Sequence, residues 1–284
     1  MILNARRTFR GVFCNTWCNY RQSRLVKSYE PDSRYFSPLR TEGLSMPLIS
    51  PETVRGRARQ RHIFALPTAS MRLVDLDLSQ LDPVLGERIS EAYATAASRL
   101  SASDPIQRNA PLFSRFDPGH RQSGPLRSCV LEDRGLRRRL QEGHELIRGG
   151  LPPMVLHGSF SIGNMLLCGN ERAPCFLHDN SSFAGPVEYD LATCLETLLD
   201  LINKNRLMNI DSGHLPELVC RLIEGFERNF MIDRSILQVI VLYQYVGHLN
   251  LYQVLMRRKG HEAPPKAAFQ KIISTFIKTM GTLL

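Results

Sequence analysis

The sequence lacks several features that would assign its class at once. None of the 284 residues lies in an uninterrupted run of about 18 apolar residues, the length that a membrane-spanning helix needs. The longest candidate, residues 236–246, contains Gln238 and Gln244, so we expect a buried helix there and no membrane partner. No internal repeat is visible. The 22% charged and 43% hydrophobic content is ordinary for a globular chain, and the length allows one or two domains with a sizeable core.

The cysteines do not form the pattern of a disulfide framework. Their number, seven, is odd, and Cys129, Cys194 and Cys220 stand in apolar runs. Buried thiols of this kind suit a reducing compartment, so we expect a cytoplasmic protein. The pairs at residues 14 and 18 and at residues 168 and 175 have poor spacings for zinc, and no pair of histidines lies near them. The cysteines therefore indicate neither disulfides nor a zinc site.

The most informative stretch runs from Met154 to Ala192. An apolar strand leads into a polar loop that carries Asn164, a second apolar strand ends at Asp179, and Asp190 opens a helix. Taken singly, Asn164 suits a turn and Asp179 suits a loop. Delivered to one place by two short strands, an Asn and an Asp make a good magnesium–phosphate site, because hard cations take oxygen ligands. Phosphoryl-transfer enzymes place these two residue types at metal-bridged phosphates, so the spacing favours a metal role.

This stretch resembles the catalytic core of the aminoglycoside phosphotransferase and choline kinase-like family. That family carries H-G-D-x-x-x-x-N, then an apolar strand ending in an Asp, then a Y-D-L-A helix start. The matching positions are His157, Gly158, Asn164, Asp179, Tyr189, Asp190, Leu191 and Ala192. The resemblance implies a kinase that uses Mg²⁺ with ATP or GTP and phosphorylates a small-molecule hydroxyl. It also implies that Asn164 and Asp179 hold the metal, while His157 and Asp190 support the loop.

One position departs from the family's motif, because Ser159 stands where the family has its catalytic Asp. Serine cannot act as a base near neutral pH without help, and general-base help is worth roughly 10²–10⁴-fold in rate. Two hypotheses follow. One is a phosphotransferase that has relocated its base, with Ser161, Asp117 and His120 as candidates, or that needs little base assistance because the transition state is loose. The other is a pseudokinase that binds nucleotide or a partner without efficient catalysis.

The N-terminal end shows a weaker part of the same resemblance. The family's small lobe has a turn with Gly and Asn, a strand with a lysine, and a helix whose glutamate pairs with that lysine. The positions that fit are Gly11, Asn15, Trp17, Lys27 and Glu42. The resemblance implies that Asn15, Lys27 and Glu42 form the nucleotide-binding part, in which Lys27 meets the phosphates. Taken alone, Lys27 also fits a solvated lysine on an edge strand.

Acidic residues are scarce in the same region. Residues 1–64 hold 12 Lys and Arg against 4 Asp and Glu, a net charge of +8, so almost all of the chain's +9 lies there. Such a segment can bind nucleic acid, and a basic nucleic-acid-binding protein is a distant alternative. Because the basic residues are dispersed and no nucleic-acid motif accompanies them, we favour a small basic lobe that attracts a polyanionic nucleotide.

The order of elements predicts an α+β protein with the two-lobed, protein-kinase-like fold. We expect a small β-rich lobe at residues 1–78 and a larger, mainly helical lobe at residues 79–284, with catalytic-loop strands at 154–180. In the small lobe, the predicted elements are two strands within 10–30, a helix at 39–48, a loop at 50–61, and a hairpin of 62–66 with 71–76. Apolar periodicity predicts helices at 87–100, 131–147, 191–202, 214–230, 235–256 and 267–283, with a loop at 101–124.

Overall fold

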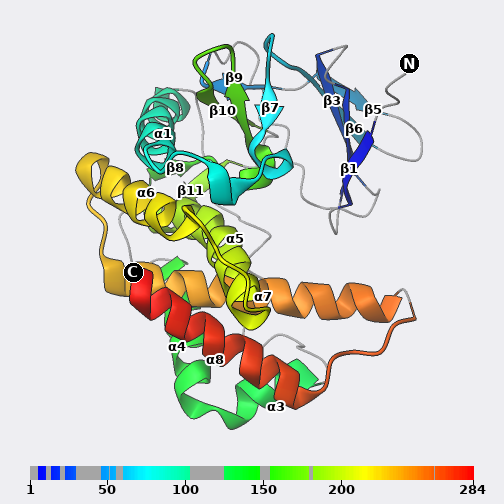
Figure 1. Ribbon diagram of the computed structural model, residues 1–284, viewed down its shortest axis with the longest axis vertical. Helices are drawn as coiled ribbons and strands as arrows, with labels where there is room; N and C mark the ends of the chain where they lie inside the picture. The colour runs from blue at the N-terminus through cyan, green and yellow to red at the C-terminus, as the bar shows by residue number, and fades with distance from the viewer. Residues whose placement is uncertain are drawn as a thin grey trace.

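The chain has a small lobe built from β-strands and a larger lobe that is mainly helical (Figure 1). The predicted fold class is therefore confirmed, and the boundary between residues 78 and 79 stays a prediction. The computed structural model describes residues 6–10, 14–19, 23–29, 46–50, 52–55, 60–102, 125–147, 154–178, 182–258 and 260–284. Within these ranges, no helix is long and apolar enough to span a bilayer.

The small lobe contains a five-stranded antiparallel sheet in the order β1-β2-β3-β6-β5. Its strands are β1 (Arg6–Arg10), β2 (Cys14–Asn19), β3 (Arg24–Tyr29), β5 (Glu52–Arg55) and β6 (Gln60–Ala65). The central strand is β3, and its Lys27 pairs in register with Thr16 on one side and His62 on the other. Lys27 is 4% exposed, so its interpretation as a solvated edge-strand lysine is wrong.

A second sheet lies between the small-lobe sheet and the helices. Its order is β4-β10-β9-β7, with β4 parallel to β10 and the other pairs antiparallel. The strands are β4 (Leu48–Ile49), β7 (Met71–Arg72), β9 (Met165–Cys168) and β10 (Ala173–Leu177). A compact apolar cluster joins the two sheets and contains Leu25, Ile49, Phe64, Leu66, Leu166, Cys168, Cys175 and Leu177.

Two predictions for the small lobe are wrong. The stretch predicted as a hairpin is not one, because β6 pairs with β3 and β5 whereas β7 pairs with β9. The predicted loop at 50–61 contains β5 and the start of β6. Of the helix predicted at 39–48, only residues 46–48 are described, and Leu48 begins β4. Residues 30–45 lie outside the described residues. Local sequence marks a strand but not its partner, since strand pairing is set by non-local burial.

The large lobe contains long helices. They are α1 (Leu85–Ala102), α3 (Pro125–Glu132), α4 (Arg134–Glu145), α5 (Val187–Leu207), α6 (Leu215–Asn229), α7 (Arg234–Arg258) and α8 (Lys266–Leu283). The helix predicted at 131–147 is divided, because Asp133 caps α4 by accepting a hydrogen bond from the Leu136 N–H at 2.9 Å. Helix α1 also continues to residue 102, while residues 103–124 of the predicted loop are outside the described residues.

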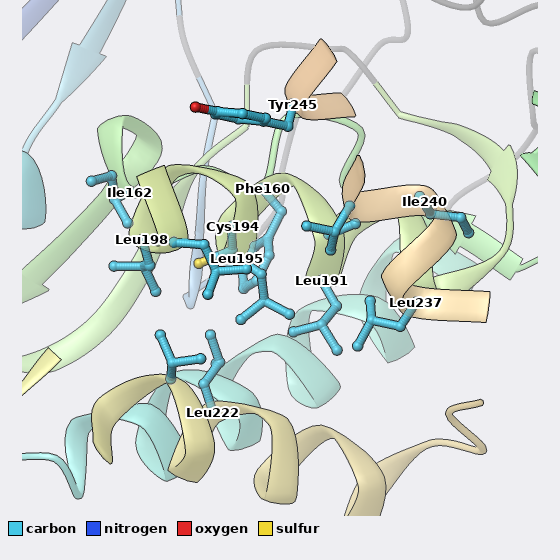
Figure 2. Close-up of a cluster of buried hydrophobic side chains, with 14 of the residues drawn as sticks. Phe160, Ile162, Leu191, Cys194, Leu195, Leu198, Leu222, Leu237, Ile240 and Tyr245 are labelled. Carbon is cyan, nitrogen blue, oxygen red and sulfur yellow. The ribbon is translucent and has the colours of Figure 1, made fainter. Parts of the chain in front are cut away.

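Helices α1 and α6 pack so closely that glycines are required between them. A Cβ added to Gly86 would lie 2.6 Å from the Leu218 carbonyl oxygen, and one added to Gly225 would lie 2.7 Å from the Ser90 Cβ. The helical core reaches the loop at residues 157–164. Figure 2 shows Phe160 and Ile162 of that loop in one buried cluster with side chains of α5, α6 and α7. The loop is therefore fastened to the interior of the large lobe.

Candidate active site

The loop that carries the family motif follows β8 (Met154–Leu156), which pairs with β11 (Phe183–Gly185). Asp190 lies in the first turn of α5 and is fully buried. Its Oδ2 accepts a hydrogen bond from the His157 N–H at 2.6 Å, and its Oδ1 accepts one from the Gly158 N–H at 3.0 Å. Gly158 has a φ of +78°, a conformation that favours glycine. One carboxylate therefore fixes the start of the loop.

The same carboxylate has a third donor on α1. The Tyr93 hydroxyl donates to the Asp190 Oδ2 at 2.8 Å. Burial raises the pKa of Asp190 to about 6, and the three hydrogen bonds oppose that rise by stabilising the ionised form. The apolar periodicity predicted a helix at 87–100 but gave Tyr93 no role in the site. The available signal was its hydroxyl, because a tyrosine inside a core needs a hydrogen-bond partner.

Ser159 and Asn164 lie on the same loop and are joined through the backbone. The Asn164 Nδ2 donates to the Ser159 carbonyl oxygen at 2.7 Å, and the Ser161 N–H donates to the same oxygen at 2.8 Å. The Ser159 N–H also lies 3.4 Å from the Nδ1 of His157. The His157 ring is buried and meets the rings of Phe160 and Phe176 edge-on. Contacts within the loop therefore hold both Ser159 and Asn164.

Lys27 connects this loop to the small lobe. Its Nζ donates to the Oδ1 of Asn164 at 2.5 Å, across 137 positions of sequence, and lies 5.4 Å from the centre of the Phe64 ring. The residue predicted to meet phosphates and one predicted to hold the metal are therefore in direct contact. The buried ammonium of Lys27 offers positive charge at this point of the structure.

The other predicted site residues are described in part or not at all. Asn15 lies on β2 opposite Ser28. Glu42 and Asp179 are outside the described residues, as are Asp117 and His120. His178 directly follows β10, and its Nε2 lies 2.6 Å from the Ser182 hydroxyl. Among the described residues, no group of three or more His, Cys, Asp and Glu side chains is placed to hold a metal.

Comparison with solved structures finds small-molecule kinases. A microcompartment-associated aminopropanol kinase matches with a TM-score of 0.53 and 14% identity over 98% of this chain and 90% of that chain. An aminoglycoside 2′-phosphotransferase, solved as a GDP complex of a mutant, matches with a TM-score of 0.53 and 13% identity over 99% and 91%. A choline kinase from Streptococcus pneumoniae matches with a TM-score of 0.50 and 12% identity over 99% and 95%.

No protein-family model and no curated protein matches the chain. At identities this low the structural likeness shows the fold alone. The chain has the two-lobed, kinase-like fold of these small-molecule kinases, as the resemblance of residues 154–192 implies. Because one fold hosts many functions, its chemistry must be argued from its own residues.

Proposed function

We propose that this protein transfers the γ-phosphate of ATP or GTP to a hydroxyl of a small molecule. The observation that carries the proposal is the contact between Lys27 of β3 and Asn164 of the loop. It brings together the two residue types that a kinase uses at the phosphates. The loop that carries Asn164 is held by a buried Asp190, and the fold is that of small-molecule kinases. We place the reaction in the cytoplasm, where thiols stay reduced.

Each residue has a role in this proposal. Lys27 would bind the nucleotide phosphates, with Glu42 and Asn15 completing that part of the site. Asn164 and Asp179 would hold magnesium, which supplies charge neutralisation at the phosphates when bound. His157 and Asp190 would hold the loop. Lys27 would move from Asn164 to the phosphates on ligand binding, because two cations at the same amide oxygen repel each other.

A second candidate is a pseudokinase that binds nucleotide without efficient turnover. Ser159 favours it, because a hydroxyl stands where proton transfer from the acceptor needs a carboxylate. The first candidate needs either another base or a transition state loose enough to proceed without one. Both candidates bind magnesium and nucleotide, so binding is tested first and turnover second.

Binding is tested by thermal-shift titration with magnesium and ATP or GTP. A ligand at 100 times its dissociation constant should stabilise the native protein by about 2.7 kcal/mol. Asn164→Ala should lose this shift, because it removes an amide oxygen that would hold magnesium in this proposal. Asn170→Ala is the matched control, since Asn170 is exposed in the turn between β9 and β10. The absence of a shift with either nucleotide in the wild type would exclude both candidates.

Turnover separates the two candidates. Wild-type protein should phosphorylate at least one acceptor in a panel of hydroxyl compounds if it is a phosphotransferase. Binding without product over the whole panel would instead support the pseudokinase. In that case Ser159→Asp should raise ATP hydrolysis by about 10²-fold or more, because it restores a carboxylate at the position of the base. An unchanged rate would show that more than the base is missing.

A further inference from the structure

Tyr93 lies at the junction of α1, α5 and the catalytic loop. It is 1% exposed, and its hydroxyl donates to the same Asp190 oxygen that accepts the His157 N–H. That oxygen therefore receives one donor from a helix remote in sequence and one from the loop. A carboxylate with donors on both sides cannot rotate without breaking one of these bonds. The hydroxyl thus limits the orientation of Asp190.

The ring of Tyr93 holds a second point of the loop. It meets the Phe160 ring at 60° with 4.5 Å between the ring centres, and the Phe226 ring at 4.9 Å. Phe160 is fully buried and directly follows Ser159. One side chain thereby contacts the loop at Phe160 and, through Asp190, at His157 and Gly158. Ser159 lies between the two fixed points.

The groups around Asp190 define its charge state. Tyr93 faces it from α1, the loop supplies the His157 and Gly158 backbone N–H groups, and Cys194 lies one turn further along α5. The Asp190 charge raises the pKa of both Tyr93 and Cys194 in addition to the effect of burial. Tyr93 therefore remains a protonated donor at neutral pH. Its hydroxyl is the only side-chain donor to Asp190 among these groups, and it opposes the rise in the Asp190 pKa that burial causes.

We infer that Tyr93 is a positioning residue of the candidate active site. Its hydroxyl holds Asp190 and its ring holds Phe160, so that the loop keeps Ser159 and Asn164 in one fixed arrangement. The inference rests on the proposed function, because that function makes the loop part of an active site. It adds a residue on α1 to a site otherwise built from β3, the loop before β9 and the start of α5.

The test variant is Tyr93→Phe, which keeps the ring and removes the hydroxyl. Tyr243→Phe is the matched control, because Tyr243 is equally buried and its hydroxyl lies 3.1 Å from the Nδ1 of His144, in the contact between α4 and α7. Affinity for magnesium with ATP, and with GTP, is measured by calorimetry from pH 5.5 to 8.5. Affinity should fall at low pH as Asp190 becomes protonated. In Tyr93→Phe the midpoint of this fall should move to higher pH, with affinity at pH 7 reduced at least about 5-fold.

A second readout does not depend on ligand. Hydrogen exchange of the peptide that covers residues 157–160 should be faster in Tyr93→Phe than in the wild type and Tyr243→Phe, because the Asp190 acceptor is less well held. Faster exchange in a protein that binds no nucleotide would support the positioning role and reject the proposed function. Nucleotide binding with an unshifted pH midpoint and unchanged exchange in Tyr93→Phe would overturn the inference and leave the proposed function standing. A shift of equal size in Tyr243→Phe would also overturn it.

Discussion

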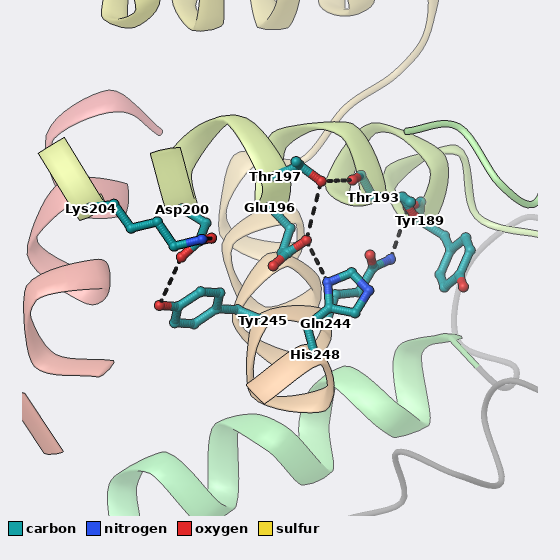
Figure 3. A network of polar contacts seen from close by, with 9 residues as sticks. All are labelled: Tyr189, Thr193, Glu196, Thr197, Asp200, Lys204, Gln244, Tyr245 and His248. Atoms are coloured by element: carbon teal, nitrogen blue, oxygen red, sulfur yellow. Dashed lines mark hydrogen bonds and ion pairs between the residues drawn. The ribbon is translucent and has the colours of Figure 1, made fainter. Parts of the chain in front are cut away.

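Helix α5 carries three buried carboxylates, Glu188, Asp190 and Glu196. Asp190 in the first turn and Glu196 about two turns further on are held in different ways. Asp190 receives neutral donors, two backbone N–H groups and a tyrosine hydroxyl. Glu196 pairs with the imidazole of His248 on α7, with 2.6 Å between Oε2 and Nδ1 (Figure 3). The first arrangement fixes a loop, whereas the second joins two helices.

The difference follows from what each partner can do. Backbone N–H groups keep the same charge at every pH, so Asp190 holds the loop whenever it is ionised. An imidazole changes charge near neutral pH, so the Glu196 contact is strongest when His248 is protonated. The surrounding network in Figure 3 includes Gln244, which donates to the Tyr189 carbonyl oxygen at 3.0 Å, and Asp200, which accepts from Tyr245 at 3.3 Å. The two carboxylates should therefore respond differently to substitution and to pH.

The largest expected effect is that of Asp190→Ala. This change leaves three buried donors without their acceptor, and each unsatisfied donor costs about 1–3 kcal/mol. Part of that cost is offset because a buried charge is removed. We expect the free energy of unfolding to fall by about 3 kcal/mol in urea denaturation at pH 7. Glu196→Ala should cost less, and an equal or larger loss there would remove the distinction between the two sites.

The pH dependence of stability should show the second largest effect. Burial raises the folded-state pKa of Asp190 to about 6, above its usual 3.8. The folded state therefore binds this proton more tightly, so stability from this group is present below pH 4 and lost as pH rises to about 6. A shift of two pKa units corresponds to about 3 kcal/mol. The difference in unfolding free energy between wild type and Asp190→Asn should change by about 2 kcal/mol across this window. If this difference in unfolding free energy stayed the same from pH 4 to pH 6, the raised pKa of Asp190 would be contradicted.

His248→Gln should have a smaller effect in a higher pH window. The Glu196 charge raises the pKa of His248 above its usual 6.5. Stability from the pair is therefore fully present below pH 6.5 and lost as pH rises through the higher folded-state pKa. Because His248 is about half exposed, we expect a loss of no more than about 1 kcal/mol at pH 6. Urea denaturation at pH 6 and pH 9 measures it, and the variant should equal the wild type at the higher pH.

The smallest effect is expected at Lys204, which pairs with Asp200 one turn away on α5. Such exposed pairs on a helix contribute about 0.2–0.5 kcal/mol. Lys204→Ala should therefore lower the unfolding free energy by no more than about 0.5 kcal/mol, and by less in 1 M salt, where exposed charges are screened. A loss above 1 kcal/mol would show that the outer part of the network is as important as the Glu196–His248 pair.

The contiguous part of the site could be predicted from sequence, and the assembled part could not. His157, Ser159, Asn164 and Asp190 lie within 34 residues, so a motif could identify them. The contact between Lys27 and Asn164 depends on how β3 is placed against the loop, which local sequence does not record. The helices were predicted well because their apolar faces repeat every three or four residues. The strand β4 was not predicted, because two residues show no period, and β7 was predicted with the wrong partner, because its true partner β9 is remote in sequence.

The close packing of α1 against α6 has a mechanical consequence for the loop. Gly86 and Gly225 allow the two helices to approach closely, since a methyl group at either position would push the helices apart. Helix α1 carries Tyr93 toward the large-lobe interior, so the gap between two backbones sets the reach of its hydroxyl to Asp190. The position of the loop therefore depends on the absence of a side chain at Gly86 and at Gly225. Neither glycine belongs to a motif for phosphate transfer.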